Sequence, residues 1–357
     1  MPEKLSEVAL LPLEISDISN QIVEKMHLEL IPEEIKQSLS HSTWLAVDGG
    51  RIVIELRNQA FMRKNGVVNL VDFDDTVLSA TKWHRAEQEL LVKNLAEFAK
   101  EFDFDQAEVK SLYEMSKIFV PSKAEKESRY TPVLNMLLLD HALRMFMKGF
   151  PKEQVFESLA KKRLLIEKAI QQLGDDYLFE LLKTAHPIIL QTFFKNTPDQ
   201  FVYQDLVEDL LTSQVAEDEV ADKTIRSIVT RGTIEGPLGQ IHKVHASGVV
   251  DGCDFIIYTN DLKEEVIQLV RQLFPELKKL PILIFDDNPK ELEACHEMIL
   301  RLKLKDVELI LVRHQDAKRR DFVIRIPADV RITKDNPVQQ ETIYDHFLAG
   351  AQNEVTN

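Results

Sequence analysis

Five apolar runs of strand length alternate along the chain with sequence that has helical spacing. In the first run the apolar positions are continuous, which is typical of a strand buried on both faces of a parallel sheet. Residues 262–274 (LKEEVIQLVRQLF) show the helical spacing, with apolar side chains every three or four positions. This alternation predicts an α/β fold with a Rossmann-like parallel sheet and short right-handed crossovers. The runs lie within residues 67–78, 223–232, 254–260, 280–293 and 307–314.

A long segment between the first two runs has a purely helical pattern. It is rich in Leu, Lys, Glu, Phe and Met and nearly free of Gly. We therefore predict an all-α domain over residues 82–222, inserted into an α/β core of residues 67–81 and 223–349. Helices are expected at residues 86–102, 131–147 and 153–173, with breaks at Pro121, 149–151, 174–175 and Pro198.

The chain before residue 67 predicts a small extension of helix and hairpin. A short helix begins near residues 32–34 (PEE), and residues 44–56 (WLAVDGGRIVIEL) predict a hairpin that turns at Asp48-Gly49-Gly50. Such an extension, residues 1–66, can lengthen a sheet edge, cover the core or form a subunit contact. The polar tail, residues 350–357, is expected to be frayed.

Composition agrees with a soluble protein of two modest hydrophobic cores. The chain has 357 residues, of which 44% are hydrophobic. No apolar run is longer than a strand, and the acidic N-terminus lacks the apolar core of a signal peptide. We therefore predict a cytoplasmic protein without a membrane span.

The net charge argues against several classes of partner, and the cysteines and histidines do not predict a metal site. A net charge of −15 argues against nucleic acid and anionic membranes, which need a basic face. The basic runs at residues 161–163 and 318–320 are typical of solvated surface. Cys253 and Cys295 predict neither a disulfide framework nor a zinc site. His242 and His245 have a spacing that can bind metal on a helix, but no third ligand is evident nearby.

Acidic residues gather where two of the apolar runs end. Asp72, Asp74 and Asp75 follow the first run, and Asp286 and Asp287 follow the fourth. The carboxyl ends of parallel strands border the ligand crevice of an open α/β sheet. Mutual repulsion there must be relieved by a cation, by protonation or by solvation, and a divalent ion is the most economical answer. A turn with an Asx cap is the alternative reading of the first acidic group.

The stretch Asp72-Phe73-Asp74-Asp75-Thr76 resembles motif I of the haloacid dehalogenase (HAD) superfamily, although most members have Gly in place of Asp75. Thr230, which ends the second run, resembles the motif II Thr that binds phosphoryl oxygens, and Arg231 beside it is assigned to the same phosphate site. Asp286 and Asp287 resemble motif IV. Asp287 aligns best with the metal-binding Asp, and Asp286 replaces the usual Gly.

Lys263, at the start of a predicted helix, is the candidate for the motif III lysine that neutralises the nucleophile and the phosphoryl group. Lys278 and Lys279, just before the fourth run, are the alternatives, although a solvated lysine pair is the simpler reading there. Glu291, one turn into the next helix, lies within reach of the metal's water shell or simply favours the helix dipole.

The resemblance implies an Mg²⁺-dependent phosphatase that acts on a small phosphorylated metabolite. Asp72 would be the nucleophile that forms an aspartyl-phosphate, and Asp74 would be the general acid and base. Mg²⁺ would be held by Asp72, the backbone carbonyl of Asp74 and the acidic pair 286–287. Thr230, Arg231 and Lys263 would bind the remaining phosphoryl oxygens.

The resemblance also implies that the helical insertion is a C1-type cap, which closes over the site and excludes water. Lys82, Trp83, His84 and Arg85 directly follow motif I and are the candidates for substrate contacts, with hinge packing as the other reading of Trp83. The identity of the substrate, the cap residues that select it and the oligomeric state do not follow from the sequence.

Asp74 favours a phosphatase within the superfamily, because dehalogenases lack an acid at this position and transport ATPases carry Thr. Three alternatives stay open. A phosphomutase uses the same motifs, a phosphonatase adds a cap lysine that forms a Schiff base, and a binding or regulatory protein can retain the scaffold without catalysis.

Overall fold

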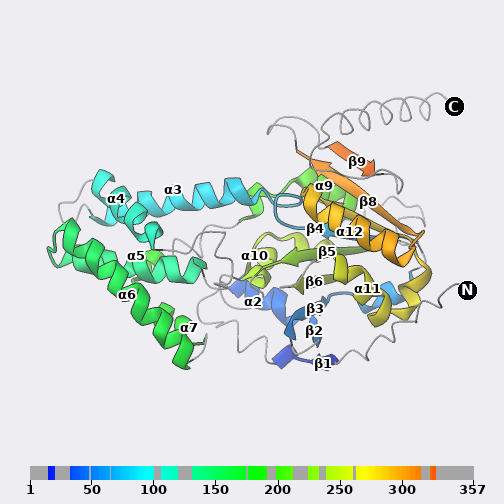
Figure 1. Ribbon diagram of the computed structural model, residues 1–357, viewed down its shortest axis with the longest axis horizontal. Helices are drawn as coiled ribbons and strands as arrows, with labels where there is room; N and C mark the ends of the chain where they lie inside the picture. The colour runs from blue at the N-terminus through cyan, green and yellow to red at the C-terminus, as the bar shows by residue number, and fades with distance from the viewer. Residues whose placement is uncertain are drawn as a thin grey trace, which may run out of the picture.

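The computed structural model describes residues 15–20, 33–47, 50–64, 66–99, 106–119, 131–173, 176–190, 198–211, 224–232, 239–259, 263–314 and 322–326. Over these ranges the chain is α/β, with one nine-stranded sheet in the order β1-β2-β3-β6-β5-β4-β7-β8-β9 (Figure 1). Its centre is parallel, in the order β6-β5-β4-β7-β8. The predicted parallel sheet is thus confirmed at its centre and is compatible with a Rossmann-like core. The central strands are β4 (Val68–Asp72), β5 (Ile225–Arg231), β6 (Phe255–Thr259), β7 (Ile282–Asp286) and β8 (Val307–Arg313).

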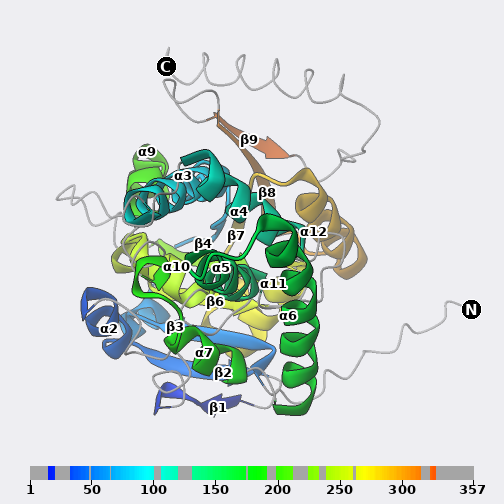
Figure 2. The same ribbon diagram turned by 90° about the vertical axis from the view of Figure 1, so that its left-hand side faces the viewer.

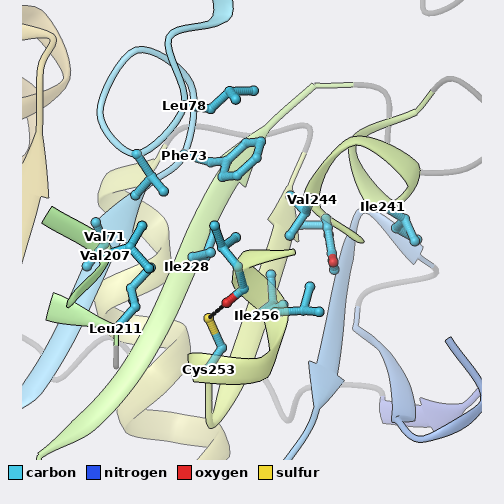
Figure 3. Packing of buried hydrophobic residues seen from close by; sticks show 14 of the residues in the cluster. Val71, Phe73, Leu78, Val207, Leu211, Ile228, Ile241, Val244, Cys253 and Ile256 are labelled. Atoms are coloured by element: carbon cyan, nitrogen blue, oxygen red, sulfur yellow. Dashed lines mark hydrogen bonds between the residues drawn. The ribbon is translucent and has the colours of Figure 1, made fainter. Parts of the chain in front are cut away.

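Both faces of the sheet are covered, which explains the continuous apolar runs. One face packs against α11 (Lys263–Leu273) and α12 (Pro289–Leu302), with Val270 and Ile299 buried between them and the strands. The other face packs against α2 (Glu33–Ser40), α9 (Gln204–Leu210) and α10 (Gln240–Ala246). Each fully buried aliphatic side chain contributes roughly 1.5–3 kcal/mol to folding. Figure 3 shows part of the second face, with Val71, Ile228 and Ile256 on three adjacent strands and Ile241 and Val244 of α10 in the same buried cluster.

The two edges of the sheet depart from the parallel pattern. β1 (Ile15–Asp17), β2 (Thr43–Val47) and β3 (Ile52–Leu56) are antiparallel, and β3 pairs antiparallel with β6. β9 (Phe322–Ile326) is antiparallel to β8 at the other edge. The predicted hairpin is confirmed, except that residues 48–49 of its turn lie outside the described ranges. Of the roles left open for the N-terminal extension, the described residues show two, because β1 to β3 lengthen the sheet edge and α2 covers part of the core.

A buried polar network fastens this hairpin to the core. Glu55 of β3 is fully buried, and its carboxylate accepts hydrogen bonds from Tyr258 Oη at 2.8 Å and Ser42 Oγ at 2.5 Å. His245 Nε2 lies 3.0 Å from Glu55 Oε2, and the Trp44 ring stacks on His245 and Tyr258. Burial raises the pKa of Glu55, but His245, the hydrogen bond from Ser42 and the charge of Arg57 together lower it below its usual value. Glu55 is therefore an ionised and well-bonded core residue.

Five further helices form a group with its own hydrophobic cluster, at one end of the sheet (Figures 1 and 2). The predicted helix at 131–147 is confirmed, those near 86–102 and 153–173 are confirmed with shifted ends, and α4 was not predicted. The turn after α5 contains Gly149 at φ +77°, where the chain was expected to break. The helices are α3 (Ala80–Ala99), α4 (Gln106–Ile118), α5 (Thr131–Met147), α6 (Lys152–Leu173) and α7 (Asp176–Lys183).

Residues 198–211 lie within the predicted insertion but pack with the sheet. Val202, Leu206 and Leu211 belong to the same buried cluster as Val71 of β4. The two ends of the helical group meet here, since Ser79 N donates to Phe201 O at 2.9 Å and Tyr203 N to Val77 O at 2.9 Å. The helical group is thus joined to the sheet next to the end of β4. No helix in the described ranges is both long enough and apolar enough to cross a membrane.

Candidate active site

The acidic residues meet at the carboxyl ends of two central strands, as the sequence predicts. Asp72 and Asp286 are the last residues of the adjacent parallel strands β4 and β7, and Asp287 follows directly. One carboxylate oxygen from each of these three residues lies within 4.8 Å of the others. We call Asp72, Asp286 and Asp287 the acidic triad. Among the described residues, it is the one group of His, Cys, Asp and Glu arranged to hold a metal ion.

Lys263 reaches the triad from the first residue of α11. Its Nζ lies 2.5 Å from Asp72 Oδ1 and 2.9 Å from Asp286 Oδ2, and its side chain is 11% exposed. Lys278 and Lys279, the alternatives, are exposed and belong to η8 (Pro275–Lys279). This segment precedes the amino end of β7, so both lysines lie at the end of the strands opposite to the triad. The structure selects Lys263 as the lysine of the site.

The triad carries more negative charge than Lys263 can balance. Burial raises the pKa of Asp72 and of Asp286, outweighing the opposite effect of Lys263. Burial and the charge of Asp72 raise the pKa of Asp287 to about 6. Burial alone would lower the pKa of Lys263, but Asp72 and Asp286 raise it instead, so Lys263 stays charged. Carboxylate oxygens with this excess charge fit a hard divalent cation.

The oxygens of the triad are not equally available to a cation. Asp286 accepts hydrogen bonds at both oxygens, from Lys263 Nζ and from the backbone N–H of Asn288 at 2.8 Å. Asp287 Oδ1 lies 3.2 Å from the Thr76 hydroxyl, which is also 3.1 Å from Asp72 Oδ2. Asp72 likewise accepts at both oxygens, from Lys263 Nζ and from the Thr76 hydroxyl, so Asp287 has the carboxylate most open to a cation. Thr76 orients both of these carboxylates, a role that sequence reasoning did not assign.

The backbone conformation of the loop after β4 explains why Asp can replace Gly at position 75. Asp75 has φ +58°, a left-handed conformation that Gly, Asn and Asp adopt most readily. Its carboxylate accepts a hydrogen bond from Thr81 N at 3.2 Å, at the start of α3. His314 Nε2 lies 2.8 Å from the backbone oxygen of Thr76 and stacks on the Tyr203 ring at 3.5 Å between centroids. Asp75, Tyr203 and His314 thus fix the loop that carries Asp74.

The carboxylate of Asp74 stands apart from the triad, as expected for a residue assigned to the metal through its backbone carbonyl and to proton transfer through its side chain. Lys243 Nζ of α10 lies 2.5 Å from Asp74 Oδ1 and 2.7 Å from Oδ2, and Gln240 Nε2 donates to Oδ2 at 3.0 Å. The ammonium group supplies the counter-charge that draws Asp74 away from the triad. The backbone carbonyl of Asp74 stays a predicted ligand. Lys243 and Gln240 were missed, because a single Lys and a single Gln on a helix carry no distinctive sequence signal.

Thr230 and Arg231 occupy different surroundings at the end of β5. Thr230 is 1% exposed, one residue beyond the strand partner of Asp72, and its hydroxyl has no hydrogen-bond partner among the described residues. A buried hydroxyl of this kind is unusual and fits a ligand oxygen. The Arg231 guanidinium instead donates to Glu291 Oε1 at 2.9 Å. Glu291 is thus paired with Arg231, and the assignment of Arg231 to phosphate requires this ion pair to open.

The remaining candidates from the sequence lie outside the acidic triad. His242 and His245 are buried on α10, where His245 contacts Glu55, and burial and His245 lower the pKa of His242 to about 4. The pair is therefore part of the core. Trp83 is 9% exposed and its ring centre lies 5.7 Å from Lys243 Nζ, while Lys82 and Arg85 are exposed. The side chain of His84 and residues 318–320 lie outside the described part of the chain. Both cysteines are buried and neither is part of a disulfide in the described residues.

No protein-family model matches the chain, and a search of the curated proteins finds no match. The function of the chain must therefore be inferred from the geometry of its own site.

Proposed function

We propose that the protein is an Mg²⁺-dependent phosphatase that hydrolyses a small phosphorylated metabolite through an aspartyl-phosphate. The observation that carries the proposal is the acidic triad around Lys263, together with the buried Thr230 hydroxyl one residue beyond the strand partner of Asp72. Among the described residues this hydroxyl has no hydrogen-bond partner. Buried carboxylates at a strand edge destabilise a fold unless a ligand or a cation balances them, so their concentration here favours chemistry. The resemblance to the haloacid dehalogenase superfamily agrees with this reading.

Each residue of the site has its own role in the proposed reaction. Asp72 and Asp287, with the carbonyl of Asp74, would hold Mg²⁺, which when bound neutralises charge and orients the phosphoryl group. The carboxylate of Asp72 attacks phosphorus, and the bond to the leaving oxygen breaks. Asp74 gives a proton to that oxygen and later takes one from the water that hydrolyses the aspartyl-phosphate. Thr230 and Lys263 bind phosphoryl oxygens as their charge increases.

The helical group supports a small substrate. It begins at Ala80, soon after the catalytic loop, and both of its ends are held beside that loop. We assign it the role of a cap that excludes water and large substrates during the reaction. The exposed side chains of Lys82 and Arg85 at its start are suited to contact an anionic metabolite.

The test is release of phosphate from a panel of sugar phosphates, nucleotides and small phosphorylated metabolites. Each compound is assayed with Mg²⁺, with EDTA, and with the Asp72→Asn variant. We expect release that requires Mg²⁺ and is abolished in Asp72→Asn, because an amide cannot form the aspartyl-phosphate. Full activity of Asp72→Asn would rule out the covalent mechanism.

The same panel separates the alternatives. Isomerisation faster than phosphate release would identify a phosphomutase. Absence of any turnover, with Mg²⁺ binding intact in calorimetry, would favour a binding protein over an enzyme.

A further inference from the structure

We propose that Lys243 is a positioning residue, which holds the carboxylate of Asp74 away from the acidic triad and directed to the leaving group. The inference rests on the proposed function. Lys243 lies on α10, far in sequence from Asp74, yet its Nζ is within 2.7 Å of both Asp74 oxygens. Its side chain is 11% exposed, compared with 31% for Asp74. Charge-assisted hydrogen bonds to both oxygens fix the orientation of a carboxylate more firmly than a single one.

The site therefore contains two separate sets of charges. Lys263 binds Asp72 and Asp286, whereas Lys243 binds Asp74. Asp74 is only two residues from Asp72, so without Lys243 its carboxylate would turn to the cation held by the triad. A hard cation readily accepts a further carboxylate oxygen. Asp74 would then be a metal ligand and no longer available for proton transfer.

The surroundings hold Lys243 in one place. Its Nζ lies 5.8 Å from the centre of the Phe73 ring and 5.7 Å from that of Trp83, both within the range of cation–π attraction. These two aromatic residues come from the loop after β4 and from α3. The position of Lys243 is thus set by the loop and the helix that border the site.

Gln240 is the second donor, and its approach depends on Gly232. Gln240 Nε2 donates to Asp74 Oδ2 at 3.0 Å and to the backbone oxygen of Arg231 at 3.2 Å. A Cβ at position 232 would lie 2.8 Å from Gln240 Nε2, and Gly232 has φ +150°. The chain after β5 therefore leaves room for Gln240 to reach Asp74. Two residues of α10 and the turn after β5 together determine where this carboxylate lies.

This role predicts a defect that depends on the leaving group. An alkoxide leaving group needs a proton as the bond to phosphorus breaks, whereas p-nitrophenolate leaves readily without one. Displacing Asp74 therefore slows transfer of the phosphoryl group to Asp72 from an alkyl phosphate and spares that transfer from p-nitrophenyl phosphate. Hydrolysis of the aspartyl-phosphate, in which Asp74 is the base, slows for both substrates. Lys243 in a merely structural role would slow the transfer step equally for both substrates, because damage to the fold would disturb Asp72 and the triad as well.

The experiment compares wild type with Lys243→Met and Lys243→Arg on p-nitrophenyl phosphate and on the best alkyl phosphate of the panel. The rate of the first turnover, followed as release of the alcohol or of p-nitrophenolate, isolates transfer of the phosphoryl group to Asp72. In Lys243→Met we expect this rate to fall about 10²-fold on the alkyl phosphate and to change little on p-nitrophenyl phosphate. The steady-state kcat should fall on both substrates, because hydrolysis of the aspartyl-phosphate needs Asp74 as its base. Lys243→Arg should restore most of the loss, because it keeps the cation. Gln240→Leu, which removes the second donor, should give a smaller defect with the same selectivity.

Lys278→Met, which removes an exposed lysine, is the matched control and should leave the rates on both substrates unchanged. Thermal melting of each variant tests whether it is folded. An equal loss in the first-turnover rate of both substrates in a folded Lys243→Met, or no such loss on the alkyl phosphate, would overturn the positioning role. Wild-type protein that releases phosphate from neither substrate would contradict the proposed function itself, and the inference with it.

Discussion

At the residue scale, the acidic triad makes the protein less stable without a cation than with one. Asp287 has a pKa of about 6 in the folded chain, compared with a usual value of 3.8, because of burial and the charge of Asp72. The folded state therefore binds more protons than the unfolded state between about pH 4 and pH 6, and stability falls as pH rises through this window. Above it, the triad is ionised at a cost that a bound cation removes.

This predicts that Asp287→Asn stabilises the metal-free protein at neutral pH. The amide keeps an oxygen that accepts from Thr76 but carries no charge. We expect a gain of about 1 kcal/mol at pH 7.5, after allowing for solvent screening of this partly exposed group, and no gain at pH 4. Urea denaturation in EDTA measures both values.

Mg²⁺ provides the control for this prediction. It should stabilise wild type at pH 7.5 and have a much smaller effect on Asp287→Asn, because the variant lacks a ligand. Equal stabilisation of both proteins by Mg²⁺ would show that Asp287 does not bind the cation.

The sequence pattern alone predicted the site residues at strand ends, but it did not predict the site residues that lie on helices. Asp72, Asp286 and Asp287 follow apolar runs, and parallel strands bring such ends together whatever the details of packing. Lys263 was predictable only through the family resemblance, since its contact depends on where α11 begins. Lys243 depends on the rotation of the short helix α10, which no pattern in the sequence specifies, and the histidines beside it gave the stronger but misleading signal.

At the element scale, the N-terminal hairpin is held to the core by polar contacts as well as by apolar ones. The hairpin itself followed from its turn and its apolar residues, but its place beside β6 did not. That place depends on Glu55, whose partners Tyr258 and His245 lie about two hundred residues further along the chain. Single-sequence patterns do not reveal such pairings.

Removal of the hydroxyl in Tyr258→Phe tests this attachment. The change deletes one donor to Glu55 Oε2 but leaves the His245 contact and the ring stacking on Trp44. We expect a loss of about 1–2 kcal/mol in the free energy of unfolding, because a buried carboxylate loses one hydrogen bond. Glu55→Ala should cost about 3–5 kcal/mol, because it leaves the other members of the network buried without their acceptor.

Denaturation followed by circular dichroism measures both losses. Tyr177→Phe, in α7 at a half-buried position, is the control and should change stability by less than about 0.5 kcal/mol. A Tyr258→Phe variant as stable as this control would show that the network does not hold the hairpin.

At the scale of the whole molecule, the hydrophobic clusters divide the chain into two parts. One part comprises the two clusters on the faces of the sheet, and the other is the cluster of α3 to α7. The strand ends next to the triad belong to the first part, while residues 77–79 and 201–203 join the two. A cation that binds the triad therefore stabilises the sheet directly and the helical group only through these junctions.

We expect calorimetry to show two unfolding transitions, of which Mg²⁺ raises only one. Leu138→Ala, in the middle of α5, should lower the other transition, because the deletion of a fully buried Leu costs about 2–5 kcal/mol in the part that contains it. Ile256→Ala, equally buried in β6, is the matched change and should lower the transition that responds to Mg²⁺. A single transition shifted by all three changes would mean that the helical group and the sheet unfold as one unit. In that case closure of the helices over the site would require rearrangement within a continuous core, because no boundary of low stability would separate the two parts.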